Sequence, residues 1–178
     1  SIDALISLAK EGMQIIAAYP NNDAGGKAII NKLLDLDKQN IPNIQIHRSL
    51  GRYLYHGVLA LATDHEKKIV CVGNSSSGIK ETPVFGCPTV NIGSRQLGRL
   101  RGQNVIDAEY KSQSIIDAVT KCFEDKNFRE SCFLTDNPYY LGNAGKKVAD
   151  ILATIEINED LIRKRMTLEG VHQDGWFK

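Results

Sequence analysis

Three consecutive serines stand between two glycines in the run Gly73-Asn74-Ser75-Ser76-Ser77-Gly78, and a carboxylate, Glu81, follows shortly after. Apolar residues 69–72 precede the run, so the pattern indicates a strand, a polar turn and the start of a helix. The first turn of a helix carries unpaired amides and a partial positive charge, which suit a phosphate. Glu81 lies about one helical turn further on, within reach of the vicinal hydroxyls of a sugar. The pattern predicts a nucleotide site, and a plain turn with a helix cap is the open alternative.

A second polar loop follows the next strand-like segment along the chain. Residues 89–92 are followed by Gly93-Ser94-Arg95-Gln96. Successive parallel strands of an open α/β sheet bring their following loops to the same edge, where ligands bind. We therefore expect Arg95 to lie beside the serines, which favours the ligand hypothesis over the plain turn.

The bulk composition is that of an ordinary globular protein and excludes several classes. The chain has 178 residues, with 22 basic and 21 acidic side chains, for a formal net charge of +1. This length fits one domain, or one domain with an appendage. The balanced charge gives no sign of nucleic-acid or membrane binding, and no apolar stretch is long enough to span a bilayer. No signal-peptide pattern is present at the start.

The cysteines and histidines predict neither a disulfide framework nor a metal site. The four cysteines are scattered without a C-x-x-C pair and are expected to be small buried side chains of a reduced, cytoplasmic protein. The four histidines lack the spacing with acids that a zinc site on a helix would show. We expect no protein-held metal and no cofactor.

Helical and strand-like segments alternate along most of the chain. Helical spacing is found in residues 1–11, 24–37, 53–62, 77–85, 112–124, 144–153 and 159–166, and short strands are expected at 14–19, 44–46, 69–72, 89–92 and 104–106. Apolar strands that alternate with helices predict an α/β fold, with a parallel sheet covered by helices on both faces. Residues 125–145, rich in Asn, Asp, Tyr and Gly, are the least compact stretch and are expected to cross the surface. The chain opens in a helix with no strand before it.

Several segments together resemble a known family. They are Pro20-Asn21-Asn22-Asp23-Ala24-Gly25, Gly73-Asn74-Ser75-Ser76-Ser77-Gly78-Ile79-Lys80-Glu81, Asn91-Ile92-Gly93-Ser94-Arg95-Gln96-Leu97-Gly98-Arg99 with Asn104-Val105, and Gly142-Asn143-Ala144. This ordered set resembles the UDP-N-acetylglucosamine 2-epimerases, from about Ser1 to Leu152. The third segment is similar to the hydrolysing branch, which makes N-acetylmannosamine for sialic acid synthesis.

The resemblance implies a fold and a domain. It implies a Rossmann-like parallel sheet that forms half of a two-domain GT-B-type fold. Residues 1–155 would be the C-terminal, UDP-binding domain with its first strand missing, and residues 156–178 a helical tail. The N-terminal domain, which carries the catalytic acids in this family, has no counterpart here, so no catalytic residue is expected in this chain.

The resemblance also implies roles for individual residues. Ser75 and Ser76 would bind the diphosphate, Glu81 the ribose hydroxyls, and the backbone at Leu50 the uracil edge. Arg95 would lie near the nucleotide, and the site would also include the loop and turn positions Asn21 and Gly78. The structural alternatives are a turn-forming role for Asn21, a surface or ion-pair role for Arg95, and a capping role for Ser77.

The implied activity is the hydrolysis of UDP-N-acetylglucosamine to N-acetylmannosamine and UDP by the full-length protein, with this chain inactive alone. The expected partners are UDP or UDP-N-acetylglucosamine and the missing N-terminal domain, and homo-oligomerisation is left open. The alternatives are a domain of a sugar-nucleotide glycosyltransferase and a non-catalytic UDP-sugar binding module. No G-x-S-x-G or G-x-G-x-x-G motif stands at the turn, which disfavours a serine hydrolase and a dinucleotide fold.

Overall fold

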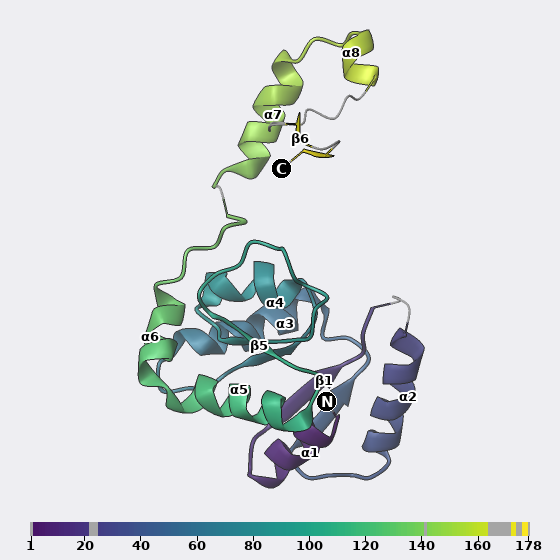
Figure 1. Cartoon of the computed structure of the whole chain (residues 1–178), viewed down its shortest axis with the longest axis vertical. Helices are drawn as coiled ribbons and strands as arrows, with labels where there is room; N and C mark the ends of the chain where they lie inside the picture. Colours follow the sequence, from purple (N-terminus) through teal and green to yellow (C-terminus); the bar gives the residue numbers. More distant parts are fainter. Residues whose placement is uncertain (1, 22–24, 141, 164–171, 174–175, 178) are drawn as a thin grey trace. The chain divides into compact units, whose positions relative to one another are not determined.

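Five short parallel strands form the framework of residues 1–140 in a computed structural model of the chain (Figure 1). The structure describes residues 2–21, 25–140, 142–163, 172–173 and 176–177. Strand β1 (Ile15–Ala18) pairs with β2 (Ile44–His47), with Ile15 opposite Ile44. In a separate ladder, β4 (Thr89–Ile92) pairs with both β3 (Cys71–Gly73) and β5 (Val105–Ala108). The parallel α/β fold is therefore confirmed, but the sheet is divided into two parts.

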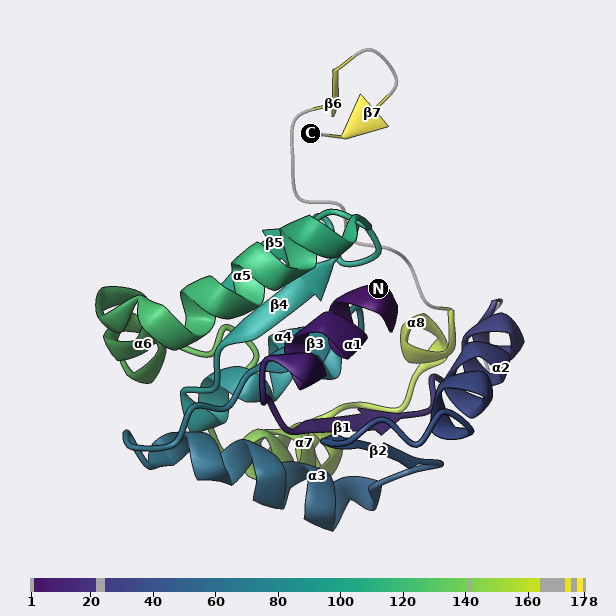
Figure 2. The same ribbon diagram turned by 90° about the horizontal axis from the view of Figure 1, so that it is seen from below.

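Helices cover both faces of these strands. One group contains α1 (Ile2–Lys10) and α5 (Ser112–Glu124), which pack against each other, and α5 also packs against β4 and β5. The other face carries α3 (Gly51–Ala60) and α4 (Ser77–Lys80), and α4 packs against β3 and β4. Helix α2 (Gly26–Asp37) packs against β2. Figure 2 shows the strands in the order β2, β1, β3, β4, β5.

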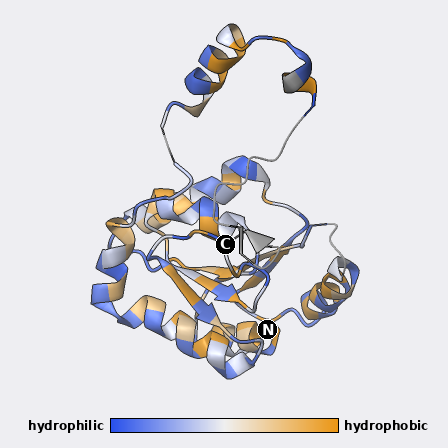
Figure 3. Cartoon of the chain, turned by 45° about the horizontal axis from the view of Figure 1, so that its top comes forward, coloured by the Kyte–Doolittle hydropathy of each residue, from blue (hydrophilic) through white to orange (hydrophobic). Residues whose placement is uncertain are grey.

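Alternate residues of the strands enter two separate apolar cores. The larger core joins Val90 of β4 with Ala4 and Leu8 of α1 and Ile115 of α5, and Ile15 and Val72 pack against it. The smaller core lies under α3 and contains Leu59, Ala62 and Cys87, with Cys71 packed against it. Cys71 and Val72 are neighbours in β3, so they point to opposite faces, as the two-fold periodicity of a strand requires. The apolar character of the central strands is visible in Figure 3.

The helix expected at residues 77–85 is shorter than predicted. Helix α4 ends at Lys80, and a 3₁₀ turn, η2 (Thr82–Phe85), follows it. Pro83 explains the break, because proline lacks an amide donor and its ring disfavours a helical conformation in the preceding residue. A second 3₁₀ turn, η1 (Leu61–Thr63), extends α3.

Residues 125–145, predicted as the least compact stretch, contain in their first part a helix that was not predicted. It is α6 (Lys126–Phe133), and Asp125 caps the helix by accepting a 3.0 Å hydrogen bond from the Phe128 amide. The helix buries Cys132 completely. An aspartate before a run that ends in buried apolar residues is a start signal that could have identified this helix.

Residues 141–178 form a second unit. It contains α7 (Ala144–Thr154), α8 (Glu159–Ile162) and an antiparallel pair of two-residue strands, β6 (His172–Gln173) and β7 (Trp176–Phe177). Part of the helix expected at 159–166 lies outside the described residues. Within the described part of the chain, no helix is long and apolar enough to cross a membrane.

Candidate functional site

We call the turn after β3, residues 74–77, the serine turn. Its hydroxyls differ in their hydrogen bonds and in their exposure. The hydroxyl of Ser77 is tied into the fold, because it lies 3.0 Å from the Tyr55 hydroxyl and donates to Ser75 Oγ at 3.1 Å. Ser75 Oγ also accepts from the Ser77 amide at 3.3 Å, so the hydroxyl hydrogen of Ser75 is left to point elsewhere. Ser75 is exposed and Ser76 half-buried. The N-cap position of α4 belongs to Ser76, whose side chain makes no capping bond, and not to Ser77 as expected.

The amides of the serine turn are those that a short helix leaves unpaired. The bonds of α4 begin at the Ile79 amide, which donates to Ser76 O at 3.1 Å. The amides before it, including those of Ser76 and Gly78, precede the first bonded position of the helix. Because α4 spans only four residues, its macrodipole is small, and hydroxyls and individual amides dominate what the turn can offer an anion.

The loop after β4 lies against the serine turn, as the sequence predicted. Arg95 Nη1 donates to Asn74 O at 3.0 Å, and Gln96 Nε2 donates to the same carbonyl at 2.7 Å. Gln96 is 2% exposed, whereas Arg95 is exposed. The buried amide of Gln96 therefore fixes the two loops together, and the exposed Arg95 guanidinium contacts the first residue of the serine turn.

Glu81 has a partner that sequence analysis missed. His56 of α3 donates from Nε2 to Glu81 Oε2 at 2.7 Å, and both side chains are somewhat over a third exposed. Phe85 packs beside the imidazole, with ring centroids 5.6 Å apart. A carboxylate has about four lone-pair sites, so this bond leaves most of the acceptor capacity of Glu81 for other donors. No local pattern links positions 56 and 81, since only the packing of α3 against η2, which Glu81 precedes, brings them together.

A network of buried polar side chains supports the short helix that follows the serine turn. Thr82 Oγ1 donates to Gly78 O at 2.7 Å and accepts from Thr89 Oγ1 at 2.8 Å and Asn104 Nδ2 at 3.0 Å. All three side chains are at most 2% exposed. The network links the short helix to β4 and to the residue before β5. Threonine and asparagine look unremarkable in the sequence, and their burial became evident only in the structure.

Gly78, predicted as a binding residue, is also favoured at its position by the packing of α4. A Cβ at this position would lie 3.1 Å from Thr89 Cγ2 and 3.7 Å from Cys71 Sγ. The first distance is tight for a carbon contact. Glycine therefore allows α4 to lie close against β3 and β4.

One further buried amide, that of Asn91 in β4, is bonded to β5. Asn91 Nδ2 donates to Asp107 Oδ1 at 2.9 Å, and Arg101 Nη1 donates to the same oxygen at 2.6 Å. The hydrogen bond from Arg101 lowers the pKa of the Asp107 carboxyl below its usual range, and partial burial opposes this. Among the described side chains, Asn91 Oδ1, Gln96 Oε1 and Asn104 Oδ1 are buried without a partner.

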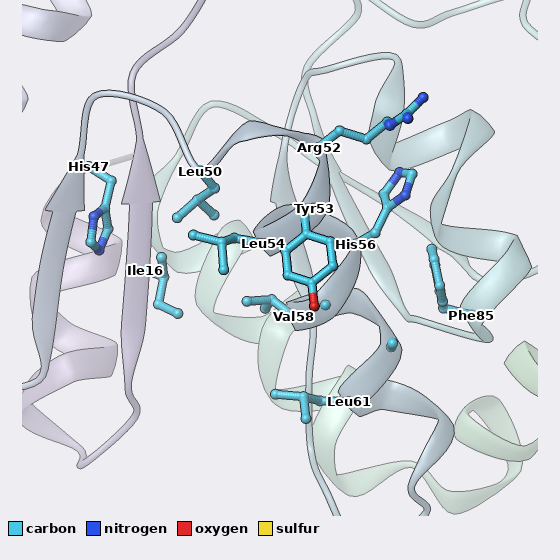
Figure 4. Close-up of a pocket in the computed structure, with 12 residues that line it drawn as sticks. Ile16, His47, Leu50, Arg52, Tyr53, Leu54, His56, Val58, Leu61 and Phe85 are labelled. Carbon is cyan, nitrogen blue, oxygen red and sulfur yellow. The ribbon is translucent and has the colours of Figure 1, made fainter.

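Leu50 and Asn21, also predicted to bind the nucleotide, differ in how they are connected to Glu81 and the serine turn. Leu50 is half-buried at the start of α3 and lines a cavity of about 790 Å³ that His47 and His56 also line (Figure 4). His56 thus connects the cavity with Glu81. Asn21 is exposed, and its carbonyl lies close to Gly26 at the start of α2. The contacts of the described residues do not join Asn21 to the serine turn, so its role stays a prediction.

The cysteines are packing residues. Cys87, Cys122 and Cys132 are at most 1% exposed, and Cys71 is half-buried. Burial raises the pKa of the Cys122 thiol to about 12 and that of Cys132 to about 11, and it also raises those of Cys71 and Cys87. At neutral pH these thiols are protonated and weakly nucleophilic. The burial of Cys87, Cys122 and Cys132 confirms the prediction of small buried side chains for these three, whereas Cys71 is half-buried.

The profile of the UDP-N-acetylglucosamine 2-epimerase family matches residues 1–153. The chain belongs to this family. It is 36% identical to a UDP-N-acetylglucosamine 2-epimerase of Neisseria meningitidis, over 64% of this chain and 28% of that protein. It is 34% identical to a hydrolysing GDP/UDP-N,N'-diacetylbacillosamine 2-epimerase of Campylobacter jejuni, over 66% and 28% of the two chains. A hydrolysing UDP-N,N'-diacetylbacillosamine 2-epimerase of Legionella pneumophila is 30% identical over 85% of this chain and 37% of its own length.

The matched region is a minor part of these epimerases. The chain spans between about a quarter and somewhat over a third of the curated relatives it matches. Family membership therefore agrees with the resemblance seen in the sequence, and it applies to the region that contains the serine turn, Glu81 and Arg95.

Proposed function

We propose that this chain supplies the UDP-binding part of a hydrolysing UDP-N-acetylglucosamine 2-epimerase. The observation that carries the proposal is the convergence of Arg95 and Gln96 on Asn74 O, which sets a cation on the residue that precedes the exposed Ser75. Glu81, held by His56, stands about one helical turn further along. A diphosphate followed by a ribose needs this sequence of groups: hydroxyl and amide donors with a cation, then an acceptor for two hydroxyls.

The groups of the site fit the departure of UDP better than proton abstraction. In the proposed reaction UDP is eliminated across C1–C2 of the sugar, and the resulting glycal is then hydrated. Donors at the serine turn and the Arg95 guanidinium would stabilise the negative charge that develops on the leaving diphosphate. Glu81 is engaged by His56 and is assigned to the ribose, so the base is proposed to come from a part of the protein outside this chain.

The hydrolysing outcome is supported by relatives. The bacillosamine 2-epimerases of Campylobacter and Legionella that resemble this chain are both named as hydrolysing enzymes. Their named substrates also carry N-acetyl groups on a nucleotide-linked sugar. Within the proposal, the nucleotide part is what this chain recognises.

Calorimetric titration of the chain with UDP tests the binding role. Glu81→Ala is expected to weaken UDP binding by roughly 1.5–3 kcal/mol, the range for hydrogen bonds to charged groups. This corresponds to about a 10- to 150-fold rise in Kd. Glu109→Ala is the matched control, because Glu109 is an exposed carboxylate paired with Lys111 outside the site. An unchanged Kd for Glu81→Ala would refute the ribose assignment.

Turnover separates the proposed role from its rivals. The chain alone is expected to bind UDP without converting UDP-N-acetylglucosamine. Hydrolysis by the isolated chain at enzyme-like rates would show that the base lies within these residues. For the full-length protein, transfer of the sugar to an acceptor without formation of N-acetylmannosamine would favour a glycosyltransferase, and binding without any reaction would favour a regulatory module.

A further inference from the structure

Tyr55 of α3 contacts the serine turn, and the functions assigned so far do not use it. Its hydroxyl lies 3.0 Å from Ser77 Oγ and 3.9 Å from Cys71 Sγ. Its ring packs against the smaller apolar core, which contains Leu59 and Cys87. The ring is therefore held in place by packing, and its single polar atom meets the turn that is proposed to bind a diphosphate.

The hydrogen bonds between the hydroxyls of Tyr55, Ser77 and Ser75 run in one direction, and we call these three groups the hydroxyl series. A hydroxyl has one hydrogen to donate and two lone pairs that accept. Ser77 Oγ donates its hydrogen to Ser75 Oγ at 3.1 Å. Because it has no second hydrogen, its bond with Tyr55 is one in which the tyrosine donates. The series therefore begins at α3 and ends at the exposed Ser75.

The hydroxyl of Ser75 has only its hydrogen left for a ligand. Ser75 Oγ accepts from the Ser77 hydroxyl at 3.1 Å and from the Ser77 amide at 3.3 Å, and these two bonds occupy both lone pairs. Ser75 can therefore donate to a ligand but has no free lone pair with which to accept. A phosphate oxygen, which only accepts, suits this hydroxyl, whereas an amine or an amide N–H does not.

The protonation of Tyr55 keeps this direction fixed. Burial raises the pKa of the Tyr55 hydroxyl well above its usual value. The tyrosine therefore retains at neutral pH the hydrogen that it donates to Ser77. Hydrogen bonds in a connected network polarise one another, so a hydroxyl that accepts such bonds becomes a stronger donor.

The next residue of α3 contacts the other part of the proposed site. His56 is bonded to Glu81 at 2.7 Å, whereas Tyr55 is bonded to Ser77. Successive side chains of a helix point about 100° apart, which allows one helix to serve two separate groups. A change at Tyr55 can therefore alter the phosphate donor without altering the acceptor assigned to the ribose.

We propose that Tyr55 is a positioning residue, which acts through Ser77 to fix the Ser75 hydroxyl as a donor to the diphosphate. The inference rests on the proposed function, because it extends the role of the serine turn in holding UDP. Without the tyrosine hydroxyl, Ser77 Oγ has a vacant lone pair. The Ser75 hydroxyl can then turn inward and donate to Ser77 in place of the ligand.

Calorimetric titration of the chain with UDP and with uridine tests the role of Tyr55. Tyr55→Phe keeps the ring and removes only the hydroxyl. It is expected to raise the Kd for UDP about 2- to 10-fold, the range that corresponds to one neutral hydrogen bond. The Kd for uridine, which lacks the diphosphate, should stay the same. Tyr140→Phe is the matched control, because Tyr140 is 74% exposed, and it should change neither constant.

Ser77→Ala interrupts the hydroxyl series at its next member and is the second variant. It should weaken UDP binding at least as much as Tyr55→Phe does, again without an effect on uridine. Because Tyr55 acts through Ser77, adding Tyr55→Phe to Ser77→Ala should raise the Kd for UDP no further. A general loosening of α3 would instead add its full effect in the double variant and would weaken uridine binding too.

The possible failures are distinguishable. A parent chain that does not bind UDP would refute the proposed function, and the inference with it. A parent that binds UDP no more tightly than Tyr55→Phe does would overturn the inference alone. Equal losses for UDP and uridine, or full additivity in the double variant, would also overturn it. If Tyr55→Phe does not fold, Ser77→Ala decides, and an unchanged Kd for UDP in that variant would overturn the inference.

Discussion

The β3–β5 part and the β1–β2 part of the divided sheet differ in the burial and the hydrogen bonding of their side chains. The β3–β5 part is held together by buried threonines, asparagines and a glutamine, all bonded to its loops and strands. The β1–β2 part has alternately half-buried and exposed residues in both strands, with Ile16 46% exposed. The comparison shows that the loops with ligand-binding chemistry belong to the β3–β5 part, in which buried polar side chains are hydrogen-bonded to the loops and strands. Preorganised donors need such support, because their orientation must be fixed before the ligand arrives.

The largest expected contrast comes from the same substitution in the two parts. Ile79 of α4 is 0% exposed and lies directly behind the serine turn, so Ile79→Ala should lower the free energy of unfolding by about 2–5 kcal/mol. Ile16→Ala should cost about 1 kcal/mol or less, because much of that side chain is already in water. Denaturant unfolding measures both. Equal losses would mean that β1 is as fully packed as the β3–β5 part.

A smaller effect is expected from the polar network. Thr82→Val removes the hydroxyl that serves Gly78 O, Thr89 and Asn104, and leaving these buried groups unpaired should cost about 1–3 kcal/mol. Thr63→Val is the control, since the exposed Thr63 hydroxyl donates only to the nearby Ala60 O, and it should change stability by about 0.5 kcal/mol or less. UDP affinity should fall for Thr82→Val as well. A variant as stable as the parent would show that the network does not hold the turn.

The smallest effect concerns the pair of Arg101 and Asp107 beside β5. Because the folded-state pKa of Asp107 is lowered, the pair stabilises the fold above the ordinary carboxyl pKa of about 4, and this contribution is lost as the pH falls through the lowered value. Arg101→Met should therefore cost less than about 1 kcal/mol at pH 6, and the difference from the parent should shrink below about pH 4. Lys38→Met, which removes an equal charge from the exposed pair with Asp35, controls for net charge. A difference that grows in acid would contradict the assignment.

The sequence predicted where the helices and strands lie better than how the strands assemble into a sheet. The periodicity located each of the strands β1 to β5 to within a few residues, and β4 and α5 to the residue, but it did not predict the two-residue strands β6 and β7. It could not show that the sheet is divided, because strand order is a property of packing and not of any local segment. Helix α6 was missed although Asp125 supplied a capping signal, since its residues are polar on average.

The candidate site was predicted in part, for a similar reason. The juxtaposition of Arg95 with the serine turn followed from the parallel order of β3 and β4, and the structure confirms it. His56, Gln96 and the Thr82 network were not predicted, because their importance depends on burial and on partners distant in the sequence. The role of each predicted residue in binding UDP stays a prediction.

The central claim is that UDP is held at the serine turn and Glu81, on the β3–β5 part of the sheet. Amide chemical shifts recorded by NMR during titration with UDP, and with uridine as the matched control, test it most directly. We expect UDP to shift the amides of Ser75, Ser76, Gly78, Glu81 and Arg95, while those of β2 and α2 stay in place. Uridine, which lacks the diphosphate, should retain the shift near Glu81 and lose those of the serine turn. Shifts confined to β1 and β2, or a serine turn that is insensitive to UDP at saturation, would contradict the account.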